Sequence, residues 1–139
     1  MKAAVVYWSA TGNTKKMAEA VAAGAEGKGA EVSIFKAPEF NSAKTDEFDS
    51  IAFGCPAMGN EELEYSIFEP MFNDVEGKLK DKKVALFGSY GWGKGIWMRS
   101  WEERCKNNGI NLVRDSVISY GEPDEDGVKA CKALGEALI

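Results

Sequence analysis

The chain has 139 residues, of which 45% are apolar and 28% are charged, and its formal net charge is −5. This length predicts a single globular domain over residues 1–139, and the composition argues against disorder. The negative charge disfavours nucleic acid as a partner, because binding to phosphates needs clustered Lys and Arg. An acidic surface favours partner proteins with basic docking faces instead.

The composition also excludes several kinds of site. The chain has no histidine, which excludes Ser–His–Asp and Cys–His nucleophiles and every metal site that uses His. Its three cysteines are far apart and form no C-x-x-C pair, so we expect no metal site and no disulfide scaffold. The longest apolar run, Ala3–Trp8, is too short for a signal peptide or a membrane span. We therefore expect a cytoplasmic protein with no membrane insertion.

Short apolar runs recur along the chain and predict buried strands. Their continuous apolarity, without alternation, is typical of a parallel sheet that is covered on both faces. The four clear runs are Ala3–Tyr7, Val32–Phe35, Ile51–Gly54 and Val84–Phe87, and a weaker fifth run is bracketed by Leu112–Val113 and Val117–Ile118.

Apolar residues at helical spacing lie between these runs. Asn13 or Thr14 is expected to cap the first helix, and acidic residues 124–126 to begin the last. Pro70 fits the first turn of a shorter helix, and residues 37–48 hold at most a short one. The alternation of strands and helices predicts an α/β protein with an open doubly wound sheet. The three clear stripes are Met17, Val21 and Ala25; Trp97, Trp101 and Cys105, with Gly109 after the helix end; and Val128, Cys131, Leu134 and Leu138.

The loop after the first strand has the composition of an anion site. Its residues, Ser9-Ala10-Thr11-Gly12-Asn13-Thr14, offer three hydroxyls and a glycine but no charged side chain. Such a loop wraps an anion with backbone N–H groups, and the following helix adds its partial positive charge. The loop lacks the Gly-Lys-Ser/Thr ending of a nucleotide P-loop. An ordinary capped helix start would use the same residue types.

The loops after the third and fourth strands have the composition of a slot for a flat ring. Pro56-Ala57-Met58-Gly59-Asn60-Glu61 contains a Gly-Asn turn in which the peptide can adopt two orientations. Ser89-Tyr90-Gly91-Trp92-Gly93 alternates aromatic residues with glycine, which suits stacking on a planar ligand. An ordinary surface turn and a loop that packs its own aromatics are the structural alternatives. Together, the three loops predict a ligand with a phosphate at one end and a flat ring at the other.

These motifs resemble those of the short-chain flavodoxins of anaerobic bacteria, and the resemblance spans the whole chain. Ser9-x-Thr11-Gly12-Asn13-Thr14 is similar to the family's FMN-phosphate loop, and the other two loops look like its ring-flanking loops. The resemblance implies a flavodoxin-like five-stranded parallel sheet of order 2-1-3-4-5 with helices on both faces. It also implies non-covalently bound FMN as the cofactor.

The resemblance assigns roles to single residues. Trp92 would stack on the outer face of the isoalloxazine and Met58 would pack on the inner face. The Gly59 carbonyl would turn toward N5 when the semiquinone carries a proton there, and Glu61 would accept from N3. The remaining predicted contacts are the phosphate loop Ser9–Thr14, the flanking residues Pro56, Ala57, Asn60, Tyr90 and Gly93, main-chain groups of Ser89 and Gly91 at the pyrimidine edge, and Glu122 at the rim.

Two residues depart from the family pattern. Ala10 stands where glycine is frequent, so the loop loses backbone freedom but keeps its N–H group. Asn60 stands where related chains often carry an acid, which removes one negative charge beside the ring. Between Ala57 and Glu76 the sequence has six acidic residues and no Lys or Arg, and this field would favour a strong reductant and steer basic partners to the ring edge.

The implied function is a low-potential one-electron carrier that cycles mainly between the semiquinone and hydroquinone of FMN. It would act as a monomer with redox proteins and have no catalytic residues of its own. An FMN-dependent NAD(P)H or quinone reductase on the same fold is the alternative. A receiver domain is disfavoured because Trp8-Ser9 and Gly54-Cys55 stand where it needs acids. The Cys-x5-Arg motif of a low-molecular-weight phosphatase is absent.

Overall fold

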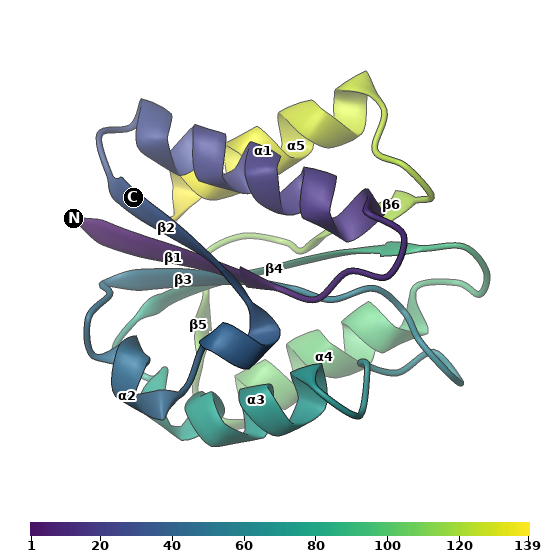
Figure 1. The fold of residues 1–139 in the computed structure, drawn as a ribbon, viewed down its shortest axis with the longest axis horizontal. Helices are drawn as coiled ribbons and strands as arrows, with labels where there is room; N and C mark the ends of the chain where they lie inside the picture. Colours follow the sequence, from purple (N-terminus) through teal and green to yellow (C-terminus); the bar gives the residue numbers. More distant parts are fainter.

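A parallel β-sheet forms the centre of the protein (Figure 1). The computed structural model describes residues 1–139. The strand order is β2-β1-β3-β4-β5, with β6 also paired to β4, so the predicted doubly wound order is confirmed. The strands are β1 (Lys2–Tyr7), β2 (Glu31–Lys36), β3 (Ser50–Gly54), β4 (Lys83–Tyr90), β5 (Asn111–Leu112) and β6 (Val117–Tyr120).

The weak fifth run of the sequence forms two short strands on one edge of the sheet. β5 pairs with Lys83–Val84 at the start of β4, and β6 pairs with Phe87–Tyr90 at its end. The residues between them leave the sheet, and Ser116 there donates two hydrogen bonds to the carboxylate of Glu102, from N at 3.2 Å and from Oγ at 2.7 Å. Charged and polar residues at 114–116 therefore explain why this run is interrupted.

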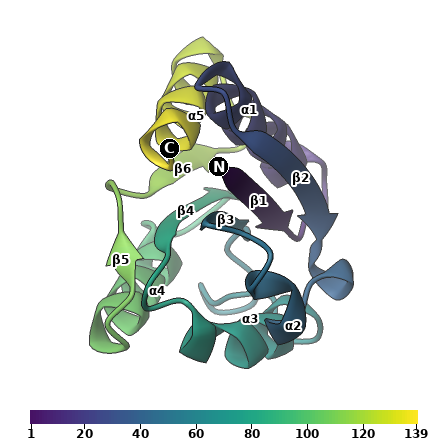
Figure 2. The same ribbon diagram turned by 90° about the vertical axis from the view of Figure 1, so that its left-hand side faces the viewer.

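Helices cover both faces of the sheet (Figures 1 and 2). α1 and α5 lie side by side on one face, and α2, α3 and α4 lie on the other. No helix has the length and apolar character needed to cross a membrane. The helices are α1 (Asn13–Gly27), α2 (Ser42–Thr45), α3 (Phe68–Val75), α4 (Ile96–Asn107) and α5 (Glu125–Ala137), with 3-10 turns at Ala37–Glu39 and Glu76–Lys78.

Most of the predicted helix boundaries are confirmed. Asp124 caps α5 by accepting from the N–H of Gly127 at 2.8 Å, Pro70 lies in the first turn of α3, and Gly109 follows α4 with a φ of 70°. The predicted cap of α1 is wrong. Gly12 occupies the N-cap with a φ of 96°, a left-handed conformation that favours glycine, and Thr14 lies inside the helix.

The two faces of the sheet bury different kinds of core. The face under α3 and α4 is rich in aromatics, where Trp101 contacts Phe68 and Phe72 edge to face at centroid distances of 5.4 and 5.6 Å. The face under α1 and α5 is built from smaller residues, many of them alanine. The small residues let α1 lie close to both the sheet and α5, and this closeness positions the loop that precedes α1.

Two glycines set the distance between α1 and α5. A Cβ on Gly24 of α1 would overlap the carbonyl oxygen of Lys132 in α5, and a Cβ on Gly135 of α5 would overlap the carbonyl oxygen of Val21 in α1. Neither glycine has a positive φ. Close backbone approach, rather than unusual conformation, is therefore the reason for glycine at both positions.

The substitution Gly24→Ala should destabilise the protein by about 2 kcal/mol or more, because the added methyl group forces two packed helices apart. Gly27→Ala is the matched control in the same helix, since a Cβ there has nothing within 4 Å. Urea unfolding of both variants measures the difference. Equal midpoints for the two variants would contradict the close contact.

Candidate functional site

The three predicted loops meet at the carboxyl edge of the sheet. The register pairs Tyr7 with Gly54 and Gly54 with Phe87, so the loops after β1, β3 and β4 leave from neighbouring strand ends. A cavity of about 180 Å³ lies there, and every residue that lines it except Gly121 belongs to the predicted site. The lining residues are Ser9, Ala10, Thr11, Asn13, Thr14, Pro56, Ala57, Met58, Ser89, Tyr90, Gly91 and Gly121.

The loop after β1 presents unpaired hydrogen-bond donors. Within residues 10–14, only the N–H of Gly12 has an acceptor in the protein, the Ser9 Oγ at 3.1 Å. The other four N–H groups have no protein partner. They precede or begin α1, whose dipole places partial positive charge there. Since none of the six residues 9–14 is charged, this arrangement suits an anion bound by neutral donors.

A buried hydroxyl pair joins the first and third loops. Thr14 Oγ1 and Ser89 Oγ share a hydrogen bond of 2.7 Å, and the two residues are 1% and 5% exposed. Both residues line the cavity. A hydroxyl can donate one hydrogen bond and accept others, so the pair fixes the start of α1 against the end of β4 and still offers polar atoms to the cavity.

The loop after β3 is a closed turn. Met58 and Glu62 exchange two backbone hydrogen bonds of 2.8 Å, which leaves Gly59, Asn60 and Glu61 as its tip. Gly59 and Glu61 both have a φ of 55°, and Glu61 is the only residue other than glycine with a positive φ. Such a conformation is costly for a side chain other than Asn or Asp, so the tip is the strained part of the site.

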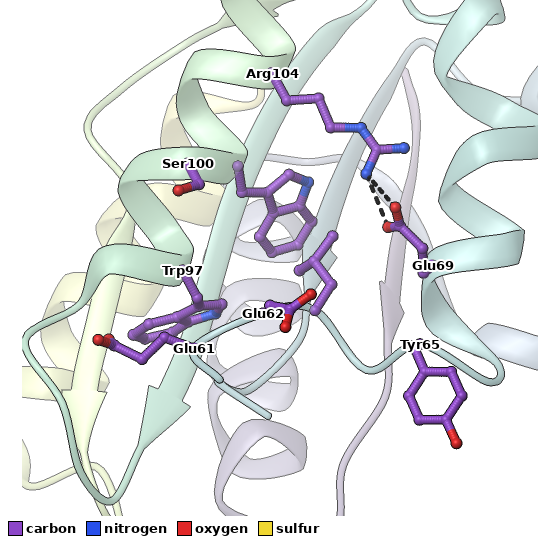
Figure 3. Close-up of a pocket in the computed structure, with 9 residues that line it drawn as sticks. Glu61, Glu62, Tyr65, Glu69, Trp97, Ser100 and Arg104 are labelled. Atoms are coloured by element: carbon purple, nitrogen blue, oxygen red, sulfur yellow. Dashed lines mark hydrogen bonds and ion pairs between the residues drawn. The ribbon is translucent and has the colours of Figure 1, made fainter. Parts of the chain in front are cut away.

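Glu61 ties this tip to the loop after β4. Its Oε1 accepts from the backbone N–H of Ile96 at 3.0 Å and of Lys94 at 3.3 Å. Gly93 has a φ of 82°, which favours glycine, and a Cβ there would also displace the Glu61 carboxylate. Figure 3 shows the Glu61 side chain beside Trp97 of α4. Glu61 Oε2 makes no hydrogen bond to the protein, so its predicted contact with flavin N3 stays a prediction.

Some predicted residues lie outside the cavity. They are Gly12, Gly59, Asn60, Glu61, Trp92, Gly93 and Glu122. Trp92 is 49% exposed and does not fold onto the body of the protein, which leaves its indole free to stack on a ligand. The side chain of Glu122 is ion-paired with Lys16 of α1. The roles predicted for these residues stay predictions.

Gly121 was missed by the sequence reasoning. It follows β6 with a φ of 71° and donates its N–H to the Tyr90 carbonyl at 2.8 Å, which brings the end of β6 to the cavity. The available signal was its position as the first glycine after the weak fifth run.

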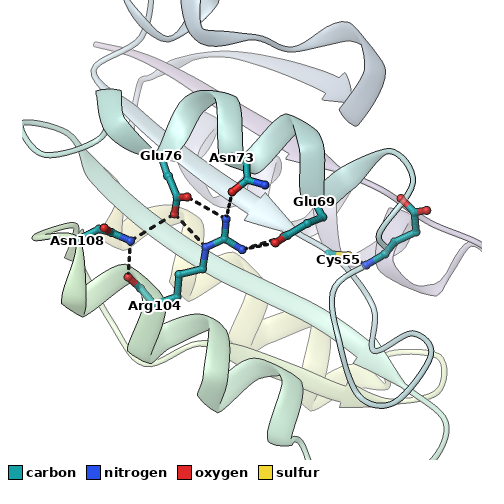
Figure 4. Close-up of polar contacts among 7 residues, drawn as sticks. Cys55, Glu69, Asn73, Glu76, Arg104 and Asn108 are labelled. Atoms are coloured by element: carbon teal, nitrogen blue, oxygen red, sulfur yellow. Dashed lines mark hydrogen bonds and ion pairs between the residues drawn. The ribbon is translucent and has the colours of Figure 1, made fainter.

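Five of the six acids between Ala57 and Glu76 accept hydrogen bonds from other groups of the protein. Arg104 of α4 donates from Nη1 to both oxygens of Glu69 at 2.8 Å, and from Nε and Nη2 to Glu76 at 2.9 Å (Figure 4). Burial alone would lower the pKa of Arg104, but these carboxylates raise it. Asp74 accepts from the N–H of Ser42 at 2.9 Å. Glu62 alone among the six acids makes no side-chain hydrogen bond.

Glu64 is the only buried charged residue, with 6% exposure. Its carboxylate accepts from the N–H groups of Ser66 (2.9 Å), Ile67 (2.8 Å) and Phe68 (2.8 Å), and also from the Ser66 hydroxyl. Burial by itself would raise the pKa of Glu64, but the four hydrogen bonds together hold it below its ordinary value. The side chain therefore stays ionised and binds the exposed N–H groups at the start of α3.

The three cysteines are buried and free. Burial raises the pKa of Cys105 and Cys131 to about 12 and that of Cys55 further. Since the thiolate is the reactive form, these groups are structural. Cys55 Sγ accepts from the N–H of Glu64 at 3.4 Å, and its carbonyl accepts from Trp97 Nε1 at 3.1 Å.

Comparisons with known proteins agree with this geometry. The flavodoxin family model matches residues 5–135. The chain belongs to the flavodoxin family. It is 44% identical to a flavodoxin from Megasphaera elsdenii over 133 residues, covering 96% of this chain and 95% of the relative. It is 47% identical to a flavodoxin from Clostridium beijerinckii over 121 residues, covering 87% and 88%.

Solved flavodoxin structures have the same fold. The solution structure of two-electron reduced Megasphaera elsdenii flavodoxin superposes with a TM-score of 0.89 at 45% identity, covering 98% of this chain and 97% of that one. As a flavodoxin, the chain is an electron carrier and FMN is its cofactor. Nothing in these matches supports the NAD(P)H or quinone reductase considered above.

The residues at the carboxyl edge fit FMN. Four unpaired N–H groups and neutral hydroxyls suit its phosphate, and no carboxylate lines the cavity to repel it. The Met58 side chain and the half-buried Tyr90 lie on the same cavity and give it apolar surface for a ring. The donor set and the apolar walls therefore match the two chemically different ends of the cofactor.

Replacing Thr14 with Val should weaken FMN binding by about tenfold or more, because a hydrogen bond to a charged group contributes about 1.5–3 kcal/mol. Riboflavin, which lacks the phosphate, is the control ligand, and its affinity should not change. Fluorescence titration of the apoprotein measures both affinities. An equal loss for the two ligands would place the effect away from the phosphate.

The depressed pKa of Glu64 predicts a pH-dependent contribution to stability. A carboxyl group whose folded pKa is lowered stabilises the fold fully above its unfolded value of about 4.3, and this stabilisation is lost as pH falls through the folded value. The free energy of unfolding of the wild type should therefore exceed that of Glu64→Gln by a constant amount near neutral pH. This difference should become smaller as the pH falls. Urea unfolding from pH 7 to pH 3 tests this, and a difference independent of pH would contradict it.

Proposed function

We propose that this flavodoxin is a low-potential one-electron carrier that works mainly between the two reduced states of its FMN. The flavin supplies the redox chemistry when bound, and the protein sets its energetics. We also propose that the chain has no catalytic residues of its own. The observation that carries the proposal is a loop of unpaired N–H donors joined at one sheet edge to a strained, glycine-containing turn.

The phosphate loop would anchor the cofactor. The N–H groups of residues 10, 11, 13 and 14 and the Thr14 hydroxyl would bind the phosphate oxygens. The donors of this loop are backbone dipoles and hydroxyls, and none of residues 9–14 is a Lys or Arg that would offset the negative charge of the phosphate. Ala10 preserves the N–H at its position, and the binding role of that position does not depend on a side chain.

The turn after β3 would respond to the redox state. Gly59 has open space around its Cα, since a Cβ there would meet nothing within 4 Å. The peptide between Gly59 and Asn60 can therefore reorient without moving neighbouring atoms. With its carbonyl turned toward the ring, it would accept the proton carried at N5, and this hydrogen bond would stabilise the one-electron-reduced state selectively.

The partners we propose are redox proteins with basic docking faces, and the protein would meet them as a cytoplasmic monomer. The net charge of −5 supports such partners. Because Arg104 offsets only one of the two charges of Glu69 and Glu76, the remaining acids between residues 57 and 76 would contribute to steering together with the total charge. Glu62 is the acid of this segment that stays free at the surface.

An anaerobic reductive titration of the FMN-loaded protein, followed by visible absorbance, tests the proposed function. We expect the long-wavelength absorbance of a neutral flavin radical to accumulate before full reduction, because a hydrogen bond available in only one redox state stabilises that state. Direct bleaching of the flavin in a two-electron step would contradict the proposed one-electron function. It would not bear on the assignment of the fold. Failure to bind FMN would contradict the assignment of the site itself.

A further inference from the structure

The loop that carries the redox-sensitive turn is fixed at its base by contacts to β4 and to Cys55, and its tip is held through the side chain of Glu61. At its start, Ala57 donates its N–H to the Ser89 carbonyl at 3.0 Å. At its end, Glu64 donates its N–H to Cys55 Sγ at 3.4 Å, which joins the last residue of the loop to the residue where it leaves β3. Between these points the Met58–Glu62 pair closes the tip.

The second half of this loop is packed against the protein only in part, with Leu63 in contact with the core. A cavity of about 230 Å³ separates its second half from α4, and the lining includes Glu61, Glu62 and Leu63 on the loop side and Trp97 and Trp101 on the α4 side (Figure 3). A segment that lies over a cavity loses the dispersion contacts that would otherwise hold it. Its position therefore depends on the anchors at its two ends and on the hydrogen bonds of Glu61 at the tip.

Glu64 is the anchor with the most hydrogen bonds. Its carboxylate makes four hydrogen bonds within residues 66–68, and its carbonyl accepts from the N–H of Glu69 at 2.9 Å. These contacts attach the end of the loop to the first turn of α3, and α3 is fixed in turn by its buried aromatics and by the ion pairs to Arg104 (Figure 4). A buried carboxylate with all these partners is costly to displace.

We propose that Glu64 is a positioning residue for the redox function: its carboxylate holds the base of the 56–63 loop against α3, so that conformational change is confined to the tip Gly59–Glu61. The inference rests on the proposed function, because it concerns the turn that responds to the flavin. Glu64 does not line the cofactor cavity and acts through the loop that it fixes. Without it, the loop samples more conformations, and ordering it costs free energy on FMN binding, most of all in the one-electron-reduced state, which needs one orientation of the turn.

The main test compares Glu64→Gln with Glu69→Gln. Both variants remove one carboxylate charge from the same segment, but the Glu69 carboxylate bonds to Arg104 and makes no hydrogen bond to the loop. We expect Glu64→Gln to raise the Kd for FMN by about tenfold, which is about 1.4 kcal/mol, and Glu69→Gln to leave it within about twofold. The apoprotein gives a second readout, in which amide exchange at Met58 and Glu62 should accelerate by about tenfold in Glu64→Gln only.

The midpoint potentials separate positioning from simple helix capping. A loosened base should reduce the preference of the tip for one conformation, so the two potentials should move toward each other, by about 59 mV for a tenfold loss. Ser66→Ala removes one of the four donors and keeps the charge. Ser66→Ala should change the FMN affinity, the amide exchange and the two potentials in the same direction but by smaller amounts. If Glu64→Gln does not fold, Ser66→Ala replaces it as the test variant.

The outcomes are distinguishable. If Glu64→Gln lowers global stability while the FMN affinity, the two potentials and the exchange of Met58 and Glu62 relative to the core stay as in wild type, Glu64 is only a helix cap and the proposal is wrong. If the wild type binds FMN but shows no one-electron-reduced state, the proposed function is wrong, whatever the Glu64 variants show. Equal effects of Glu64→Gln and Glu69→Gln would assign the result to charge alone and also overturn the proposal.

Discussion

The parallel alignment of the strands is the constraint on which the rest of this structure depends. Because β1, β3, β4 and β6 all run in one direction, their carboxyl ends meet at one edge. Residues as far apart in sequence as Thr14 and Ser89 then come within 2.7 Å. A phosphate site and a ring site need different chemistry, and the sheet places both at one edge, on adjacent loops and on the last residues of β4.

The electrostatics of the site depend on pairing more than on composition. The segment after β3 has no Lys or Arg in its own sequence, yet Arg104 from α4 offsets one of the two charges of Glu69 and Glu76, and N–H groups at the start of α3 surround Glu64. An ionised side chain that is enclosed in this way contributes little to the field at a distance. Counting acids along the chain therefore overestimates the negative potential that reaches a partner protein or the flavin.

The fold could be predicted well from the sequence because strand runs and helical stripes are local patterns. The runs near β1, β3 and β4 are continuous and apolar, and all three strands are buried. The site loops could be predicted because Gly, Ser and Thr cluster directly after those runs. The cap at Gly12 was missed because Asn13 and Thr14 have side chains that usually form caps, whereas here the Thr14 hydroxyl bonds to Ser89 instead.

Long-range partners could not be predicted in the same way. Nothing near Glu64 in the sequence distinguishes it from Glu62, and only the fold shows that one is buried and the other exposed. The same holds for Arg104, which reaches Glu69 across 35 residues, and for Gly121, whose role depends on β6 lying beside β4. Each of these depends on which elements are neighbours in space, and periodicity along the chain does not contain that information.

The close approaches of Gly24 to Lys132 and of Gly135 to Val21 divide the mechanical roles within the molecule. Two helices that touch backbone to backbone have no side chains to rearrange between them, so α1 and α5 behave as a rigid support for the phosphate loop. The ring-flanking turn lies on the other side of the cavity, above a hollow and with a strained tip. A cofactor held in this way has one immobile end and one adjustable end. Few atoms need to move when its charge changes, and small nuclear rearrangement is what fast electron exchange requires.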